Sequence, residues 1–318
     1  MNNPEFGQTQ APIRSTGLDG SAGSLFLSTN VEVLPRGTLR SLLVVSVARV
    51  LSEVGFGDEL LGTGFARGAK ARGKRIAFGD GKRIIWNHLS EQIFKGNPNI
   101  APPGSENDRD IEWHPFCRGN RIYNRQVGDR WEWNYSFRPI LGEVFFTPDE
   151  IEFGKRHGSG FVVIEPNMQV KGFGPNKQWT VDRYDAVANK LASEGHRIRQ
   201  FYYGAGHRLA AAEQIKTPSF RHAARILKNA ALYIGPEGGL HHASAAVGIP
   251  AVVLFGGFIP PGVTGYGTHT NLAAPGTPCG SLSACEHCKA AMASISVGDV
   301  MDAARAFLSG AKSDIVAA

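Results

Sequence analysis

The 318-residue sequence lacks an apolar run long enough to cross a membrane, and it lacks the features of an exported, disulfide-bonded protein. Its longest apolar run, Leu42–Leu51, is about half the length of a spanning helix and contains Arg49. The first residues show no basic start followed by an apolar core, so we expect no secretory signal. Three of the four cysteines crowd at one end, which does not suggest a disulfide framework. We therefore expect a cytoplasmic protein.

Extended runs of like charge are also absent. The basic stretch Lys70–Arg75 has no interleaved aromatic residues and is typical of a solvated helix end, so we expect no nucleic-acid partner. The formal charge of +6 favours anionic partners such as nucleotides, phosphorylated glycans or the inner face of the cytoplasmic membrane. Hydrophobic residues make up 42% of the chain and charged residues 19%, which excludes disorder of the whole chain.

The length favours two domains, because single cores usually hold about 100–200 residues. Residues 1–37 are polar with little periodicity and are predicted to be a flexible tail. We predict an N-terminal domain over residues 38–155, with a helix over 55–71 and a strand over 74–78. The C-terminal domain is predicted over residues 156–318.

The second half of the chain alternates short strands and helices. The predicted strands are 161–164, 198–203, 231–234 and 251–255, and the predicted helices are 181–194, 219–229 and 240–247. Strands buried on both faces and separated by helices are typical of a doubly wound parallel sheet, so the fold class is α/β. Ligands of such sheets bind at the carboxyl ends of the strands, beside helix N-termini.

One strand-to-helix junction, residues 235–256, carries unusual chemistry. An acid, Glu237, and two glycines precede the pair His241–His242. Glycines let a ligand approach the unpaired N–H groups and the positive end of the helix dipole, which suits phosphate. Glycine also serves ordinary tight turns, and a buried histidine is more often part of a core than a ligand.

The order of residues in this junction resembles the nucleotide-sugar half-site of the heptosyltransferase family, bacterial glycosyltransferases of family nine. Two further blocks carry the same resemblance: Lys177-Gln-Trp179 after the first strand of the C-terminal domain, and Gly57-Asp58 at the start of a helix. The resemblance implies donor binding by Lys177 and by the residues Glu237, Gly238, Gly239, Leu240 and His242. It implies Asp58 as the catalytic general base, although an isolated Asp at this place more often caps a helix.

The resemblance implies a GT-B fold, in which two Rossmann-like domains face each other across a cleft and the final helix crosses back onto the first domain. It implies that the N-terminal domain over 38–155 binds the acceptor and that the C-terminal domain over 156–318 binds the nucleotide sugar. It implies an inverting, metal-independent transfer of a heptose-like sugar from an ADP-heptose-like donor to a lipopolysaccharide-type, anionic glycan or glycolipid acceptor. We expect the acceptor to contact Trp113, Arg121 and Arg138, because aromatic faces stack on sugars and arginines pair with acidic groups. Two alternatives stay open: a nucleotide-sugar epimerase or hydrolase on the same fold, and a non-catalytic protein that binds glycans or nucleotides.

Cys279, Cys285 and Cys288 lie within ten residues, and His287 stands between the last two. The close pair has the spacing of zinc or iron ligands. A four-ligand site needs one more group, which could be Cys117, a histidine or nothing. The cluster predicts a structural zinc or iron site, with reduced, inert thiols as the alternative.

Overall fold

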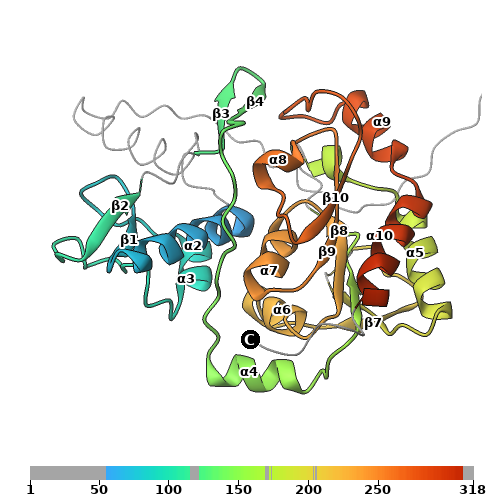
Figure 1. Cartoon of the computed structure of the whole chain (residues 1–318), viewed down its shortest axis with the longest axis horizontal. Coiled ribbons are helices and arrows are strands. Elements are labelled where there is room, and N and C mark those ends of the chain that lie inside the picture. The colour runs from blue at the N-terminus through green and yellow to red at the C-terminus, as the bar shows by residue number, and fades with distance from the viewer. Residues whose placement is uncertain are drawn as a thin grey trace, which may run out of the picture. The chain divides into compact units, whose positions relative to one another are not determined.

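The computed structural model describes residues 55–114, 122–168, 172, 174–202, 204 and 206–310 (Figure 1). Up to residue 155, the helices and strands are α2 (Phe56–Ala71), β1 (Arg75–Phe78), α3 (His88–Phe94), β2 (Ile111–His114), β3 (Asn124–Val127), β4 (Arg130–Trp133) and α4 (Pro148–Lys155). The remaining elements are β5 (Val162–Ile164), the 3₁₀ helix η1 (Gly174–Lys177), α5 (Val181–Ser193), β6 (Ile198–Phe201), β7 (Ala212–Ile215), α6 (Phe220–Leu227), β8 (Leu232–Pro236), α7 (Gly239–Val247), β9 (Ala251–Gly256), α8 (Pro261–Thr264), β10 (His269–Ala273), α9 (Glu286–Ser294) and α10 (Val297–Gly310).

Six parallel strands form one sheet in the order β10-β9-β8-β5-β6-β7. The chain adds β6 and β7 on one side of β5, then returns and adds β8, β9 and β10 on the other side. The direction of winding reverses between β5 and β8, which is the place where sheets of this kind bind dinucleotides and related ligands. The fold therefore draws attention to the residues that follow β5 and β8.

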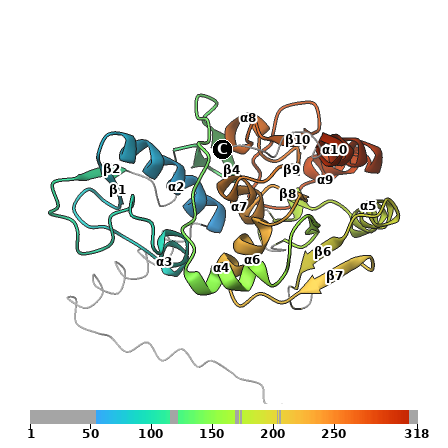
Figure 2. The same ribbon diagram turned by 60° about the horizontal axis from the view of Figure 1, so that its bottom comes forward.

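Helices cover both faces of this sheet (Figures 1 and 2). Val163 and Tyr233 pack in one core with residues of α6 and α7, whereas their neighbours Val162 and Leu232 pack in a second core with residues of α5 and α10. Successive strand residues point to opposite faces, so a strand covered on both faces must be apolar throughout. The double covering explains why these strands are uninterrupted apolar runs in the sequence.

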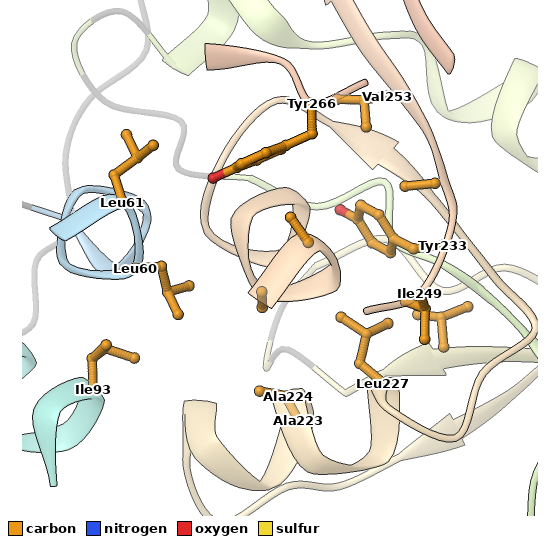
Figure 3. Packing of buried hydrophobic residues seen from close by; sticks show 14 of the residues in the cluster. Leu60, Leu61, Ile93, Ala223, Ala224, Leu227, Tyr233, Ile249, Val253 and Tyr266 are labelled. Carbon is orange, nitrogen blue, oxygen red and sulfur yellow. The ribbon is translucent and has the colours of Figure 1, made fainter. Parts of the chain in front are cut away.

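Helix α2 packs directly on α7. Leu60 and Leu61 of α2 are 0% and 1% exposed and belong to the core that also contains Ala243 of α7. Figure 3 shows these leucines, together with Ile93 of α3, across α7 from Tyr233 of β8. This packing brings the first turn of α2 to the first turn of α7.

The segment before the large sheet contains two small sheets: the parallel pair β1–β2 and the antiparallel hairpin β3–β4. Helix α4 follows and begins at the predicted start signal, where the Thr147 hydroxyl accepts a hydrogen bond from the backbone N–H of Glu150. Arg221 of α6 pairs with Glu150 at 2.6 Å, and both side chains are almost fully buried. The ion pair fastens α4 to α6.

The α/β class with a doubly wound parallel sheet is confirmed, as are the four predicted strands and the helices between them. Two strands of the sheet, β7 and β10, were not predicted. The final helix packs on α5 and on β8, β9 and β10, so the expectation that it crosses back onto the first domain is wrong for the residues through 310. The proposed tail lies outside the described residues, and the domain boundaries stay a prediction.

Candidate active site

The loop after β8 presents the first of the predicted site residues. Glu237 follows the last residue of β8, Gly238 is the N-cap of α7 and Gly239 begins the helix. A Cβ added at Gly238 would meet no atom within 4 Å, so the space beside the helix start is open to a ligand. Gly239 is confined, because its Cβ would lie 3.4 Å from Phe56 and from the Phe220 ring. The helix start thus combines unpaired N–H groups with open space.

Lys177, Glu237 and His242 form a buried cluster at this helix start. Their side chains are 11%, 5% and 3% exposed. The Lys177 ammonium donates to Oε2 of Glu237, and Nε2 of His242 lies 3.3 Å from Oε1 of the same carboxylate. Burial opposes ionisation of Glu237, but Lys177 and the hydrogen bond from His242 outweigh it and hold the pKa of this carboxyl below its ordinary value. Glu237 is therefore ionised at neutral pH.

Tyr266 fixes the second ring nitrogen of His242. The tyrosine hydroxyl lies 2.9 Å from Nδ1 of the histidine. Because Nε2 faces a carboxylate, Nε2 carries the proton and Nδ1 accepts from the hydroxyl. Burial raises the pKa of Tyr266, so its hydroxyl keeps its proton. No sequence motif marked this residue.

The 3₁₀ helix η1 holds Lys177 in place through its neighbours. Trp179 is 1% exposed and donates from its indole nitrogen to the carbonyl of Ile295 at 3.0 Å. Asn176, also 1% exposed, donates to the carbonyls of Ser281 and Ser283. The Lys177 ammonium lies 5.2 Å from the centroid of the Phe258 ring. The buried side chains of Asn176 and Trp179 thus anchor this segment and hold Lys177 against Glu237.

Asp58 lies in the first turn of α2, close to this cluster. A Cβ added at Gly57, the residue before it, would lie 2.7 Å from Cδ2 of His242 and 3.7 Å from the carbonyl carbon of Gly238. Two separate motifs, Gly57-Asp58 and Gly238–His242, therefore meet at two helix N-termini. Their positive dipole ends both favour an anion there.

The Asp58 carboxylate has two partners within the chain. Oδ2 accepts from the backbone N–H of Gly55 at 2.8 Å, which is the helix-capping role weighed above. Oδ1 accepts from the hydroxyl of Tyr123, an 8%-exposed residue that the sequence did not single out. The carboxylate is half-buried and held from both sides, as a positioned acceptor of a proton requires.

A second buried carboxyl, missed in the sequence, lies at the end of β5. Oε1 of Glu165 accepts from the backbone and the side-chain amide of Asn167, and burial raises its pKa to about 7. Glu165 and Glu237 end neighbouring strands, β5 and β8, at the place where the winding reverses. The sequence feature that could have identified Glu165 is Glu165-Pro-Asn167, which directly follows a buried strand.

The described residues among those predicted to contact an acceptor, Trp113 and Arg138, have partners within the chain. Trp113 of β2 packs against a small apolar cluster that contains Ala77 and Ala101. Arg138 donates from Nη1 to the carbonyls of Tyr135, Phe137 and Gly262, so it holds backbone in place. Arg121 lies outside the described residues. Acceptor contacts by these side chains stay a prediction.

The cysteine cluster is a compact set of sulfur and nitrogen atoms. Sγ of Cys279 lies 3.6 Å from that of Cys285 and 3.0 Å from that of Cys288, and Nδ1 of His287 lies 3.9 Å from Sγ of Cys288. All four ligand atoms lie within 4.8 Å of one another. A tetrahedral metal with bonds of about 2.3 Å separates its ligands by about 3.8 Å, so the spacing fits a zinc or iron ion after small adjustments. Cys117, one of the options for the fourth ligand, lies outside the described residues.

Comparisons with known proteins give one match to a family and several to solved structures. Residues 152–280 match the family described as glycosyltransferase family 9 (heptosyltransferase). No curated protein matches the chain. Among solved structures, Escherichia coli ADP-heptose lipopolysaccharide heptosyltransferase II aligns with 17% identity over 55% of this chain and 56% of its own, with a TM-score of 0.42.

Two other solved structures from E. coli are similar. Heptosyltransferase WaaC with ADP aligns with 18% identity over 48% of this chain and 45% of its own, with a TM-score of 0.35. The iron-containing dodecameric glycosyltransferase TibC aligns with 18% identity over 59% of this chain and 53% of its own, with a TM-score of 0.41. The chain thus spans about half the length of the solved structures it matches.

The family match covers the part of the site on the large sheet. It includes Lys177, the helix start at Gly238 and Gly239, and Cys279, whereas Asp58 lies before it. The match agrees with the resemblance found in the sequence. Residues 152–280 are thus similar to glycosyltransferase family 9 (heptosyltransferase), over less than half of the chain.

Proposed function

We propose that the protein is an inverting glycosyltransferase that moves a sugar from a nucleotide-diphosphate donor to a glycan acceptor. The observation that supports the proposal is the close approach of Gly57, the residue before Asp58, to His242 and Gly238 in the first turn of α7. A base from one motif and a phosphate-binding helix start from another then share one site. Helix capping explains an aspartate at position 58, but it does not explain why the first turn of α2 lies against the first turn of α7.

The donor diphosphate would lie at the N-terminus of α7, beside Gly238, Gly239 and Leu240. The helix dipole and the ammonium of Lys177 would neutralise the departing diphosphate, which makes the proposed transfer independent of a catalytic metal. Glu237 would accept hydrogen bonds from sugar hydroxyls, and His242 would donate from Nε2.

In the proposed reaction Asp58 accepts the proton of an acceptor hydroxyl. The oxygen attacks the anomeric carbon on the face opposite the diphosphate, the bond from that carbon to the diphosphate oxygen breaks, and the nucleoside diphosphate leaves. Tyr123 would orient the carboxylate by donating to its other oxygen. The sugar configuration is inverted, because a single displacement occurs.

The donor we propose is ADP-heptose or a close analogue, and the acceptor a lipopolysaccharide-type glycan. Both rest on the resemblance. Among the described residues, no helix is long and apolar enough to span a bilayer. A cytoplasmic location, with peripheral contact to the membrane that carries a glycolipid acceptor, completes the proposal.

Calorimetry with ADP, UDP, GDP and CMP tests the donor site. We expect selective binding of ADP that Lys177→Ala weakens about tenfold or more, because one charged contact to phosphate is lost. Exposed Lys190→Ala is the matched control. Because Lys177→Ala leaves Glu237 buried without its ion-pair partner, the double variant Lys177→Ala/Glu237→Gln separates lost binding from lost stability.

Asp58→Asn tests the chemistry. The amide keeps the size of the side chain but cannot take a proton, so ADP affinity should persist while transfer falls by about a hundredfold or more. A protein that binds no nucleotide is not a transferase of this kind. Acceptor-independent change of the donor sugar in product analysis would instead favour an epimerase or hydrolase.

For the cysteine cluster we propose a structural zinc or iron ion held by Cys279, Cys285, Cys288 and His287. The backbone N–H of Cys285 donates to Oδ1 of Asn176, the residue before Lys177, so the ion would brace the lysine. We expect about one equivalent of metal in the purified protein, and less in Cys285→Ser together with weaker ADP binding. If the protein without metal were as stable as the protein with metal and bound ADP with the same affinity, the cysteines would be inert thiols and not metal ligands.

A further inference from the structure

A cavity of about 320 Å³ lies at the carboxyl ends of β9 and β10. This volume is at the lower end of those that bind small molecules. Its walls come from the loops after the two strands and from the segment after β4. The lining residues are Tyr135, Gly256, Gly257, Pro260, Pro261, Ala273, Ala274, Pro275, Gly276, Thr277, Pro278 and His287. None of the site residues named above except His287 is among them.

The lining has a distinct chemistry. The described lining residues include four prolines, one tyrosine ring, one threonine hydroxyl and the imidazole of His287, and none of these described residues carries a carboxylate, ammonium or guanidinium group. Proline rings and an aromatic face suit the C–H faces of a sugar, while a hydroxyl suits its polar edge. Among the described lining residues, an ionised ligand would find at most His287, one of the proposed metal ligands, as a partner of opposite charge. The lining therefore favours an uncharged ligand.

Tyr135 is exposed to 57%, unlike most large aromatic residues of the protein. Its position does not depend on side-chain packing, because its backbone is held instead. Arg138 donates to the carbonyl of Tyr135 at 2.7 Å and to that of Gly262, in the first turn of α8, at 3.2 Å. A fixed backbone that presents an exposed ring at a cavity is typical of a ligand contact.

The glycine walls are structurally required. Gly256 has a φ of 59°, and a Cβ there would lie 2.3 Å from Sδ of Met292. A Cβ at Gly257 would lie 2.7 Å from Cβ of Ala291. Larger residues at positions 256 and 257 would thus displace α9. This wall of the cavity is therefore formed by backbone atoms and not by side chains.

The cavity adjoins the donor site without being part of it. Gly257 precedes Phe258, whose ring lies under the Lys177 ammonium. The residues proposed to hold the donor, from Lys177 to His242, do not line the cavity. A donor anchored by its diphosphate at α7 leaves this space to the other substrate.

We propose that this cavity is an acceptor subsite and that it binds an uncharged sugar ring, with Tyr135 as the stacking residue. The inference rests on the proposed function and narrows it. An acidic or phosphorylated unit of the acceptor would have to lie outside the cavity. In this proposal Arg138 acts by holding the backbone carbonyl of Tyr135.

Saturation-transfer NMR on the full chain, with and without ADP, tests the subsite. The probes are the methyl glycosides of glucose, galactose and mannose, and the methyl glycoside of glucuronic acid as the charged counterpart. We expect at least one neutral probe to bind and the acid to bind more weakly. Tyr135→Ala should weaken the neutral probe roughly fivefold, in line with the energy of one aromatic contact.

Two variants control this measurement. Tyr135→Phe keeps the ring and should stay within about twofold of the wild type. Tyr202→Ala removes another exposed tyrosine, which lies after β6 and outside the cavity, and should leave binding unchanged. Equal loss in both alanine variants would overturn the proposal.

The outcomes separate this inference from the proposed function. If ADP binds and none of the neutral glycosides does, or if the acid binds as well as they do, the subsite is refuted while the transferase proposal stands. If Tyr135→Ala weakens ADP-sugar binding instead, the cavity belongs to the donor. Absence of ADP binding to the wild type refutes the proposed function itself.

Discussion

Replacing Gly57 with alanine tests whether the first turn of α2 must lie against His242 in the first turn of α7. The new methyl group would lie 2.7 Å from Cδ2 and 3.4 Å from Nε2 of His242. The first distance is shorter than carbon atoms tolerate, so either His242 or the first turn of α2 must move. Movement of the ring breaks its contact with Glu237, which lies 3.3 Å from Nε2.

The size of the effect follows from two opposed terms. Gly→Ala inside a helix stabilises it by up to about 1 kcal/mol. Overpacking of a tight contact costs about 1–3 kcal/mol, and loss of a hydrogen bond to a charged group costs about 1.5–3 kcal/mol. The steric and hydrogen-bond terms together exceed the gain in helix propensity, so we expect net destabilisation of about 1.5–5 kcal/mol and about tenfold weaker ADP binding.

Gly68→Ala is the matched control in the same helix. A Cβ at Gly68 lies 3.7 Å from the end of the flexible Arg72 side chain, which is ordinary contact. This variant should gain up to about 1 kcal/mol from helix propensity with ADP affinity unchanged. Urea unfolding and calorimetry on both variants give the comparison. Equal behaviour of the two variants would show that Gly57 does not press on His242, and the shared site would lose its support.

Two further predictions concern buried charges. Burial raises the pKa of Glu165 to about 7, whereas the same carboxyl in the unfolded chain loses its proton near pH 4.5. The free energy of unfolding should therefore fall by roughly 3 kcal/mol as the pH rises from about 4.5 to about 7. Glu165→Gln should remove this fall in urea titrations across pH, and an unchanged slope would contradict it. Arg221→Ala should cost about 3–5 kcal/mol because it leaves Glu150 buried alone, whereas Arg305→Ala, which breaks an exposed pair with Glu194, should not measurably change the melting temperature.

Local patterns predicted most of the sheet, and the exceptions have a common cause. Strands β5, β8 and β9 are covered on both faces, so their residues are apolar and easy to recognise. The missed strands, β7 and β10, are the two edges of the sheet. Ala212-Glu-Gln-Ile215 is polar because an edge strand is partly solvated, and its pattern is then that of a loop.

For the site, the sequence predicted which residues carry chemistry better than it predicted how they meet. Lys177 and Glu237 are 60 residues apart, and their contact depends on the sheet order. Tyr123 reaches Asp58 across 65 residues, and nothing in its neighbourhood marks it. For Arg138, the residue type suggested pairing with an acidic group of the acceptor. In the structure its hydrogen-bond partners are backbone carbonyls, which a sequence pattern does not reveal.

The electrostatics of the cluster explain why two helix starts are needed. Without a ligand, the ammonium of Lys177 and the carboxylate of Glu237 form a buried pair of zero net charge. A diphosphate placed beside this pair would add negative charge that Lys177 alone cannot balance, since the lysine already contacts Glu237. In the proposed site, the remaining attraction would come from the N-termini of α7 and α2, which approach each other through Gly57 and His242. We therefore expect the glycine at position 57 to contribute to anion binding, because a side chain there would keep the N-terminus of α2 from coming so close.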